Sequence, residues 1–150
     1  GSSPGGWAQV SSNIIENGKI LSLDLKKMDP LKKVSFLQCD FLDRTTRNKV
    51  YNFFGNNVDV VLSDMAADTT GNKSLDCIRT NQLCAEIIDF STGILKPKGV
   101  LVSKLFMGDD FLEVKKLANL KFKKVQFFKP DASRRESKET YLHCSILKTL

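Results

Sequence analysis

The sequence predicts an α/β fold with a mostly parallel, doubly wound sheet and an antiparallel strand at the C-terminus. Three observations support this prediction. Short apolar runs typical of strands alternate with longer segments of helical periodicity. The apolar run over 58–62 is bounded by turn residues, as expected for a buried parallel strand. Two strand-like segments, 122–128 and 140–147, follow one another without a helix between them, which favours an antiparallel pair.

The first part of the chain is expected to hold two helices and three strands. The helices show apolar residues near helical spacing, and the strands are short apolar runs that end beside an acidic residue. Gly18 is placed to end the first helix, because glycine suits the backbone conformation of a helix terminus. In order, the elements are a helix over 7–17, strands over 19–24 and 34–39, a helix over 43–54 and the strand over 58–62.

The second part is expected to alternate helices and strands up to the final strand pair. A long helical pattern covers 74–95, and the sequence Lys-Pro-Lys-Gly that follows has the composition of a turn. No internal repeat or linker is visible, so we expect one domain over 1–150. The later elements are a turn over 96–99, a strand over 100–106, a helix from 108–110 to about 120, the strand over 122–128, a polar loop over 129–138 and the strand over 140–147.

The composition is that of a globular protein with a basic surface. Apolar residues make up 41% of the 150, and no run approaches the ~18 apolar residues that a membrane helix needs. The formal net charge of +6 favours a polyanionic partner. The four cysteines lack Cys-x-x-Cys spacing, so we expect free thiols in a reducing compartment and no metal site. We expect a monomer without membrane association, in the cytoplasm or, alternatively, in the mitochondrial matrix.

Three strands end beside acidic side chains that can line one crevice with the Gly-rich opening of the chain. These side chains are Asp24, Asp40 and Asp64. Ligands of open α/β sheets bind at the carboxyl ends of the strands, where a carboxylate can accept hydrogen bonds from a ribose. The glycines do not match Gly-x-Gly-x-x-Gly, which disfavours a nicotinamide or flavin cofactor. S-adenosylmethionine, a sulfonium cation without a pyrophosphate, suits such acids better. An alternative for Asp64 is that it only caps the next segment.

A lysine interrupts the apolar strand over 100–106. A buried ammonium group without a partner would cost free energy. We therefore expect Lys104 to pair with Asp64 and Glu139. The alternative is that Lys104 lies on an outward face of its strand and points into solvent.

Motifs along the whole chain are similar to those of one enzyme family. In order they are Gly-Ser-Ser-Pro-Gly-Gly-Trp, Leu-Asp-Leu with Met-Asp-Pro, Gln-Cys-Asp-Phe, Leu-Ser-Asp-Met-Ala, Val-Ser-Lys-Leu-Phe, and Lys-Pro-Asp-Ala-Ser-Arg with Ser-Lys-Glu-Thr-Tyr. Together they resemble the FtsJ family (RrmJ/RlmE type) of ribosomal RNA 2′-O-methyltransferases. The resemblance implies a Rossmann-like, S-adenosylmethionine-dependent methyltransferase fold. It also implies methylation of a uridine 2′-hydroxyl in large-subunit (23S-type) ribosomal RNA, in the A-loop of the peptidyl-transferase region.

The resemblance implies roles for individual residues as well. The family's cofactor-binding positions correspond here to Gly5, Gly6, Trp7, Asp24, Asp40 and Asp64. Its catalytic set corresponds in part to Asp64, Lys104 and Glu139. The family's first catalytic lysine and first strand precede the Gly-rich loop, so we expect them upstream of this sequence. The family's usual proline after Asp-Met-Ala is Ala67 here, and its asparagine is Asp68, so that loop is expected to differ in shape.

Lys104 is the candidate base for the methyl transfer that the resemblance implies. The reaction requires alignment of oxygen, methyl carbon and sulfur, and removal of the hydroxyl proton. A free lysine has a pKa of about 10.4; burial and a nearby sulfonium would lower that pKa, whereas Asp64 and Glu139 would raise it. We favour Lys104 as the base, positioned by the two carboxylates. The alternative is that Lys104 remains a cation and orients the ribose.

The polar loop over 129–138 is the candidate RNA-binding segment. Basic residues exceed acidic ones over 115–138, and Arg134, Arg135 and Lys138 lie just before Glu139. A basic loop beside the active centre can bind the phosphates of ribosomal RNA. Lys115 and Lys116 are better explained as a solvated helix face. His143 is given no catalytic role.

Other functions remain open at this point. One alternative is another RNA 2′-O-methyltransferase, acting on transfer RNA or on a messenger RNA cap. A methyltransferase for a base or a protein side chain is disfavoured, because Ser-Asp-Met-Ala replaces the motifs that base-directed enzymes carry after the fourth strand. A further alternative is a non-catalytic RNA-binding relative, against which the presence of Asp64, Lys104 and Glu139 argues.

Overall fold

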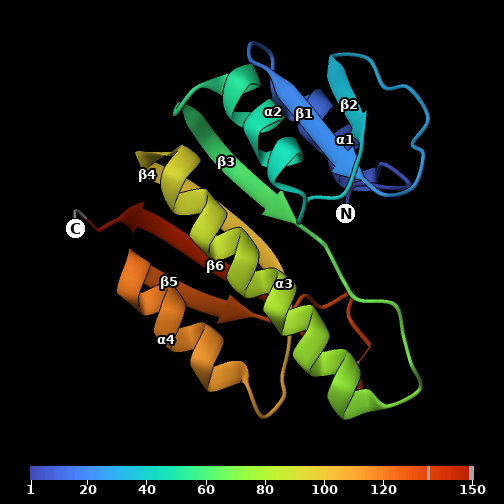
Figure 1. Cartoon of the computed structure of the whole chain (residues 1–150), viewed down its shortest axis with the longest axis vertical. Helices are drawn as coiled ribbons and strands as arrows, with labels where there is room; N and C mark the ends of the chain where they lie inside the picture. The colour runs from blue at the N-terminus through green and yellow to red at the C-terminus, as the bar shows by residue number, and fades with distance from the viewer. Residues whose placement is uncertain (135, 149–150) are drawn as a thin grey trace. The chain divides into compact units, whose positions relative to one another are not determined.

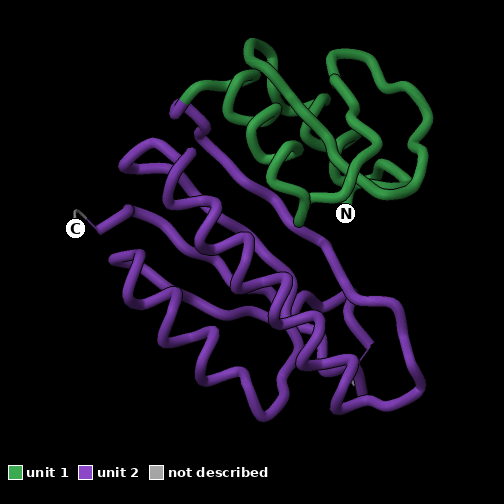
Figure 2. The backbone as a smooth tube through the Cα atoms, viewed as in Figure 1, with its two compact units in different colours: residues 1–55 green, residues 56–150 purple. Residues whose placement is uncertain are grey.

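The computed structural model describes residues 1–134 and 136–148 of the chain. They fall into two compact units, Gly1–Gly55 and Asn56–Leu150, which Figure 2 colours separately. Each unit contains its own sheet, with strand order β1-β2 in the first unit and β3-β4-β6-β5 in the second.

The first unit combines two parallel strands with two helices (Figure 1). Its elements are α1 (Gly6–Ile14), β1 (Ile20–Asp24), β2 (Val34–Gln38) and α2 (Arg44–Phe54). In the pairing of the strands, Asp24 lies opposite Gln38 at the end of the ladder. The parallel arrangement therefore brings Asp24 and the loop that holds Asp40 to the same end of this sheet.

The ends of the two helices follow from local hydrogen bonding and backbone conformation. The Asp43 carboxylate accepts a hydrogen bond from the Thr45 N–H at 2.8 Å, which caps α2 where the sequence predicts its start. Helix α1 is shorter than the expected 7–17 and ends at Ile14. Ile15 has the extended backbone conformation, which cannot continue a helix.

The second unit is a four-stranded sheet with two helices. Its elements are β3 (Val58–Ser63), α3 (Lys73–Ile94), β4 (Leu95–Phe106), α4 (Phe111–Lys121), β5 (Phe122–Phe128) and β6 (Glu139–Leu147). Strands β3 and β4 are parallel, whereas β6 lies between β4 and β5 and is antiparallel to both. The predicted fold class, with parallel strands and an antiparallel C-terminal strand, is therefore confirmed.

The core of the second unit lies between its sheet and its helices. Alternate residues of β4 and β6, including Leu101, Leu105 and Leu142, are fully buried, as is Ile88 of α3. This alternation follows the two-residue period of a strand. The intervening residues of β4, Lys104 among them, lie on the other face of the sheet.

Two expectations about the second unit are wrong in detail. The segment over 96–99 belongs to β4 and is not a separate turn. The pairing of β4 with β3 nevertheless skips from Leu95 to Val100, so residues 96–99 form a bulge.

The strand over 58–62 is parallel but not buried: Val60 and Leu62 are 52% and 44% exposed. The reason is that β3 is an edge strand of its sheet.

A buried amide fixes the end of β4. The Asn81 side chain, on α3, is fully buried. Its Nδ2 donates to the Phe106 carbonyl at 2.9 Å and to Asp110 Oδ1 at 2.8 Å, and its Oδ1 accepts from the Phe106 N–H at 2.8 Å. Because these bonds satisfy the backbone groups at the last residue of β4, they hold in place the strand that carries Lys104.

Candidate functional site

Three neighbouring strands bring an ammonium group between two carboxylates in the second unit. Asp64 directly follows β3, Lys104 lies in β4, and Glu139 begins β6. Lys104 Nζ is 2.9 Å from Asp64 Oδ1 and 3.0 Å from Glu139 Oε1. The Lys104 side chain is only 14% exposed, so the predicted pairing is present and the solvent-facing alternative is wrong.

A fourth residue, Tyr141, completes this cluster and was not identified from the sequence. Its hydroxyl lies 2.9 Å from Asp64 Oδ1 and 3.2 Å from Glu139 Oε1, so it can donate its one proton to either of the two oxygens that Lys104 contacts. Tyr141 is opposite Lys104 in the β4–β6 ladder. The sequence held a usable signal: Glu139 and Tyr141 are two residues apart in a strand, which places both side chains on one face.

The electrostatics of the cluster favour a protonated lysine. Burial of the Lys104 ammonium lowers its pKa, but hydrogen bonds and charge attraction from Asp64 and Glu139 more than offset this, and the net pKa is raised. In this structure Lys104 is therefore a cation at neutral pH. A protonated lysine favours the alternative in which Lys104 is a fixed cation over the expected role of Lys104 as the base.

Tyr141 is held in its neutral form by the same carboxylates. Burial raises the pKa of Tyr141, and the hydrogen bonds and charges of Asp64 and Glu139 raise it further. A phenolate would lose its donated hydrogen bond and face two negative charges. Tyr141 therefore serves as a hydrogen-bond donor that fixes the two carboxylates relative to Lys104.

Helix α3 anchors the loop that follows Asp64. The Ala67 N–H donates to Thr80 Oγ1 at 3.2 Å, and both the N–H and the hydroxyl of Thr70 donate to Asp76 Oδ1, at 2.8 and 2.7 Å. Thr80 is fully buried, and Asp76 is nearly so. These bonds hold the loop in place on both sides of Asp68. They do so even though Ala67 and Asp68 replace the proline and asparagine of the family's motif.

In the first unit, Asp24 organises the Gly-rich loop. Its Oδ2 accepts from the Ser3 N–H at 2.9 Å, and its Oδ1 accepts from the Lys26 N–H at 2.8 Å. Burial raises the pKa of Asp24, but these hydrogen bonds together with the charges of the Gly1 amino group and Lys26 lower it by more, so the carboxyl is ionised near neutral pH. Each oxygen keeps a further lone pair, which leaves capacity to accept a bond from a ligand hydroxyl.

The other predicted cofactor residues of the first unit also lie in or beside loops. Gly5 is buried at the N-cap of α1 with a φ of 122°, a conformation that favours glycine, and a Cβ there would meet Met28 Sδ at 3.3 Å. Gly6 and Trp7 begin α1. Asp40 is exposed after β2, and its Oδ1 accepts from the Leu42 N–H at 2.9 Å.

Part of the predicted RNA-binding loop is placed by the structure. Arg134 and Lys138 are exposed, whereas Arg135 lies outside the described residues. The Met107 N–H donates to the Lys138 carbonyl at 2.8 Å, which ties the end of the loop to the end of β4. Because Lys138 directly precedes Glu139, this end of the loop adjoins the Lys104 cluster.

The cysteines are free thiols, as the sequence predicts. Cys77, Cys84 and Cys144 are buried, and Cys39 is half-buried. Burial raises the pKa of Cys84 to about 11 and that of Cys144 to about 12, so both are uncharged packing residues at neutral pH.

Within 1–134 and 136–148, no group of His, Cys, Asp and Glu could hold a metal ion. No helix in those ranges is long and apolar enough to cross a membrane.

Comparisons with known proteins agree on one family. Residues 1–146 match the model of the FtsJ-like methyltransferases. The chain is 42% identical over 148 residues to the "Ribosomal RNA large subunit methyltransferase E" of Pelagibacter ubique, and 41% identical over 148 residues to the Rickettsia akari protein of that name. The matches cover 99% and 95% of this chain, and 73% and 65% of those two proteins.

Solved structures show the same fold. A Plasmodium falciparum protein described as a ribosomal RNA methyltransferase aligns with a TM-score of 0.86 at 26% identity, over 98% of this chain and 83% of that one. Human methyltransferase-like protein 13, crystallised in complex with SAH, aligns with a TM-score of 0.69 at 14% identity, over 97% of this chain and 69% of that one.

The neutral state of Tyr141 can be tested by spectroscopic titration. Tyr51 and Tyr141 are the only tyrosines of the chain, so in a Tyr51→Phe background the phenolate absorbance reports Tyr141 alone. We expect no phenolate while circular dichroism shows native structure, because ionisation would place a negative charge beside Asp64 and Glu139. Adding Asp64→Asn and Glu139→Gln should move the midpoint toward the ordinary value of about 10. A midpoint near 10 without those two changes would contradict the geometry.

Proposed function

Because the chain belongs to the FtsJ-like methyltransferase family, we propose that it methylates large-subunit ribosomal RNA with S-adenosylmethionine as the methyl donor. The target is the 2′-hydroxyl of a uridine in the A-loop of the peptidyl-transferase region. The observation that carries this proposal is the Lys104 ammonium, held between Asp64 and Glu139 at the ends of three adjacent strands. The two relatives named as ribosomal RNA large subunit methyltransferases support the choice of substrate.

The two units together form one methyltransferase domain in this proposal, since the family match runs through both of them. Residues of the first unit bind the cofactor: the loop with Gly5, Gly6 and Trp7, the ionised Asp24 beside the ribose hydroxyls, and Asp40 beside the adenine. The family's motif also assigns Asp64 to the cofactor. When bound, the cofactor supplies a methyl group activated by a positively charged sulfur.

Lys104 acts in this proposal as a fixed cation. Two of its three N–H groups are directed to Asp64 and Glu139, which leaves the third for the oxygen of the attacking hydroxyl. The raised pKa of Lys104 argues against the base role favoured by the sequence, because a base must first lose its proton. The hydroxyl proton would then pass to solvent water late in the transfer, as the methyl group leaves the cofactor sulfur for the hydroxyl oxygen, while Lys104 keeps its own proton and orients that oxygen. Arg134 and Lys138 bind phosphates of the RNA, and the sequence assigns the same role to Arg135.

Calorimetry on an Asp24→Ala variant tests the cofactor site. We expect S-adenosylmethionine to bind more weakly by about 1–3 kcal/mol, because a hydrogen-bond acceptor for the ribose is lost and the Gly-rich loop is released. Asp29→Ala is the matched control, since Asp29 is an exposed acid of the same unit. Equal affinities of the Asp24→Ala variant and the unaltered protein would contradict the assignment.

Transfer of a labelled methyl group tests the reaction. The purified protein is mixed with methyl-labelled S-adenosylmethionine and large ribosomal subunits that lack the modification, and the RNA is digested to nucleosides. We expect the label in 2′-O-methyluridine. Lys104→Ala should lower the rate by a factor of about 10²–10³, the usual cost of removing one positioned hydrogen-bond donor at the reacting atoms.

The conservative variant separates the two roles of Lys104. Lys104→Arg should retain much more activity than Lys104→Ala, because arginine preserves the positive charge but cannot release a proton near neutral pH. Equal loss in both variants would favour the base role instead.

Label in transfer RNA or in a messenger RNA cap would identify another 2′-O-methyltransferase, and absence of label from every RNA would favour the non-catalytic alternative.

A further inference from the structure

We propose that single-stranded RNA flanking the methylated nucleotide lies in a groove that crosses the free edge of β5 and leads to the Lys104 cluster. This inference rests on the proposed function, because it assigns a path to the same RNA substrate. The groove consists of two adjoining hollows of about 570 and 500 Å³, both in the second unit. Lys115 and Asn119 of α4 line both hollows, so the two form one continuous surface.

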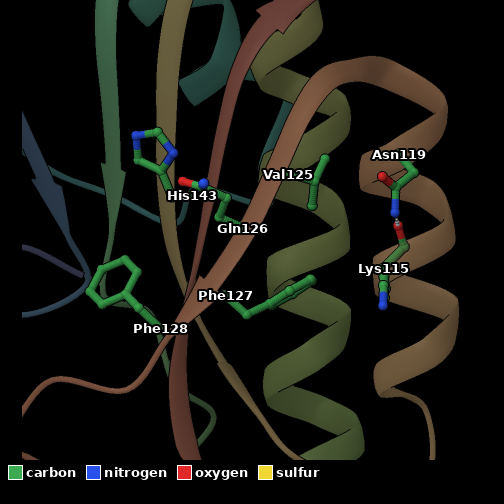
Figure 3. Close-up of a pocket in the computed structure, with 7 residues that line it drawn as sticks. All are labelled: Lys115, Asn119, Val125, Gln126, Phe127, Phe128 and His143. Carbon is green, nitrogen blue, oxygen red and sulfur yellow. Dashed lines mark hydrogen bonds between the residues drawn. The ribbon is translucent and has the colours of Figure 1, made fainter.

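The first hollow straddles β5. Figure 3 shows Val125 and Phe127 on the helix side of this strand, and Gln126 and Phe128 on the opposite side together with His143. Because β5 is the last strand in the order β3-β4-β6-β5, no further strand of the described residues covers its outer edge. A flexible ligand can therefore pass from one side of the sheet to the other at this edge.

The charge of the groove suits phosphate groups. Lys115, Lys116 and Lys148 line it and are exposed, and no acidic side chain lines either hollow. Lys96 and Lys121, by contrast, each lie within 4 Å of an aspartate, so part of their charge is already neutralised. Lys148 Nζ donates to the Asn119 carbonyl, which holds this cation over α4.

An exposed aromatic ring connects the groove with the Lys104 cluster. Phe128 lines the first hollow and remains 45% exposed. Its ring stacks on the ring of Tyr141, with centroids 5.8 Å apart and an interplanar angle of 23°. The hydroxyl of the same tyrosine contacts Asp64 and Glu139. A base stacked against Phe128 would therefore lie close to the nucleotide whose 2′-hydroxyl meets Lys104.

The groove combines the groups that recognise single-stranded RNA. Lysines in a groove that no acidic side chain lines attract the backbone, an exposed aromatic ring stacks on a base, and the amides of Asn119 and Gln126 can bond to base edges. An acidic peptide would use the lysines but leave the ring and amides unexplained. A rigid RNA duplex keeps its bases stacked inside, where Phe128 cannot reach them. The observations therefore favour an unpaired strand.

Binding of a short single-stranded oligouridine to the purified protein tests this inference. Phe128→Leu should weaken binding roughly 5- to 150-fold, the effect of losing one aromatic–base stack, whereas Phe128→Tyr should bind as the unaltered protein does. Lys115→Ala should reduce the slope of log affinity against log salt by about 0.7, the value for one phosphate contact on a single strand. Lys98→Ala is the control: Lys98 is exposed on β4, which β6 separates from β5, and its loss should change neither quantity.

The outcomes separate this inference from the proposed function. Unchanged oligouridine binding by Phe128→Leu and Lys115→Ala would overturn the groove even if the protein methylates ribosomal RNA. Equal weakening by Phe128→Tyr and Phe128→Leu would also overturn it, because the effect would then not come from stacking. Equally strong competition by an RNA duplex would exclude an unpaired occupant. If the unaltered protein methylates no RNA, the proposed function fails, while the binding measurements still decide whether the groove holds RNA.

Discussion

The site of the second unit is built around one half-buried cation that is paired with two carboxylates. Lys104 lies in β4, where partial burial disfavours its charge, and Asp64 and Glu139 stabilise the charged form from the neighbouring strands. Removing both carboxylates would leave the ammonium without a partner, and removing the cation would leave two carboxylates facing each other. Tyr141 adds a neutral donor to the same oxygens. The strand order β3-β4-β6 is what places all four groups together.

The surroundings of this cluster keep the three strands in position. Asn81 fixes the end of β4, the loop after Asp64 is anchored by Thr80 and Asp76 of α3, and the Met107 N–H ties the loop before Glu139 to β4. A preorganised cation can orient a hydroxyl without having to rearrange at the moment of reaction. The stack of Tyr141 on Phe128 links this centre to the proposed groove on β5, so in our proposal the binding of a strand and the positioning of its ribose share one residue.

Much of this could be predicted from the sequence, and the remainder depended on pairing between distant strands. The apolar runs and acidic strand ends predicted the elements, and the lysine within 100–106 indicated a buried ion pair. The bulge in β4 and the exposure of β3 were missed, because composition does not reveal which strand lies at an edge. Tyr141 was overlooked because tyrosine in a strand usually only packs, and its hydroxyl partner Asp64 is 77 residues away. The sequence indicated only a solvated helix face for Lys115 and Lys116. It could not reveal the groove, because the two hollows join residues of α4 with distant residues of β5 and β6 and with Lys148.

The most direct test of this account is the pKa of the Lys104 ammonium. It can be measured by NMR titration of lysine labelled with ¹³C at Cε, with the Lys104 resonance assigned by its absence from the Lys104→Arg variant. The account predicts a midpoint above the ordinary value of about 10.4, because the nearby carboxylates stabilise the charged form. It also predicts a lower midpoint when Asp64→Asn and Glu139→Gln are introduced. A midpoint near or below 8 in the unaltered protein would contradict the fixed cation and restore Lys104 as the base.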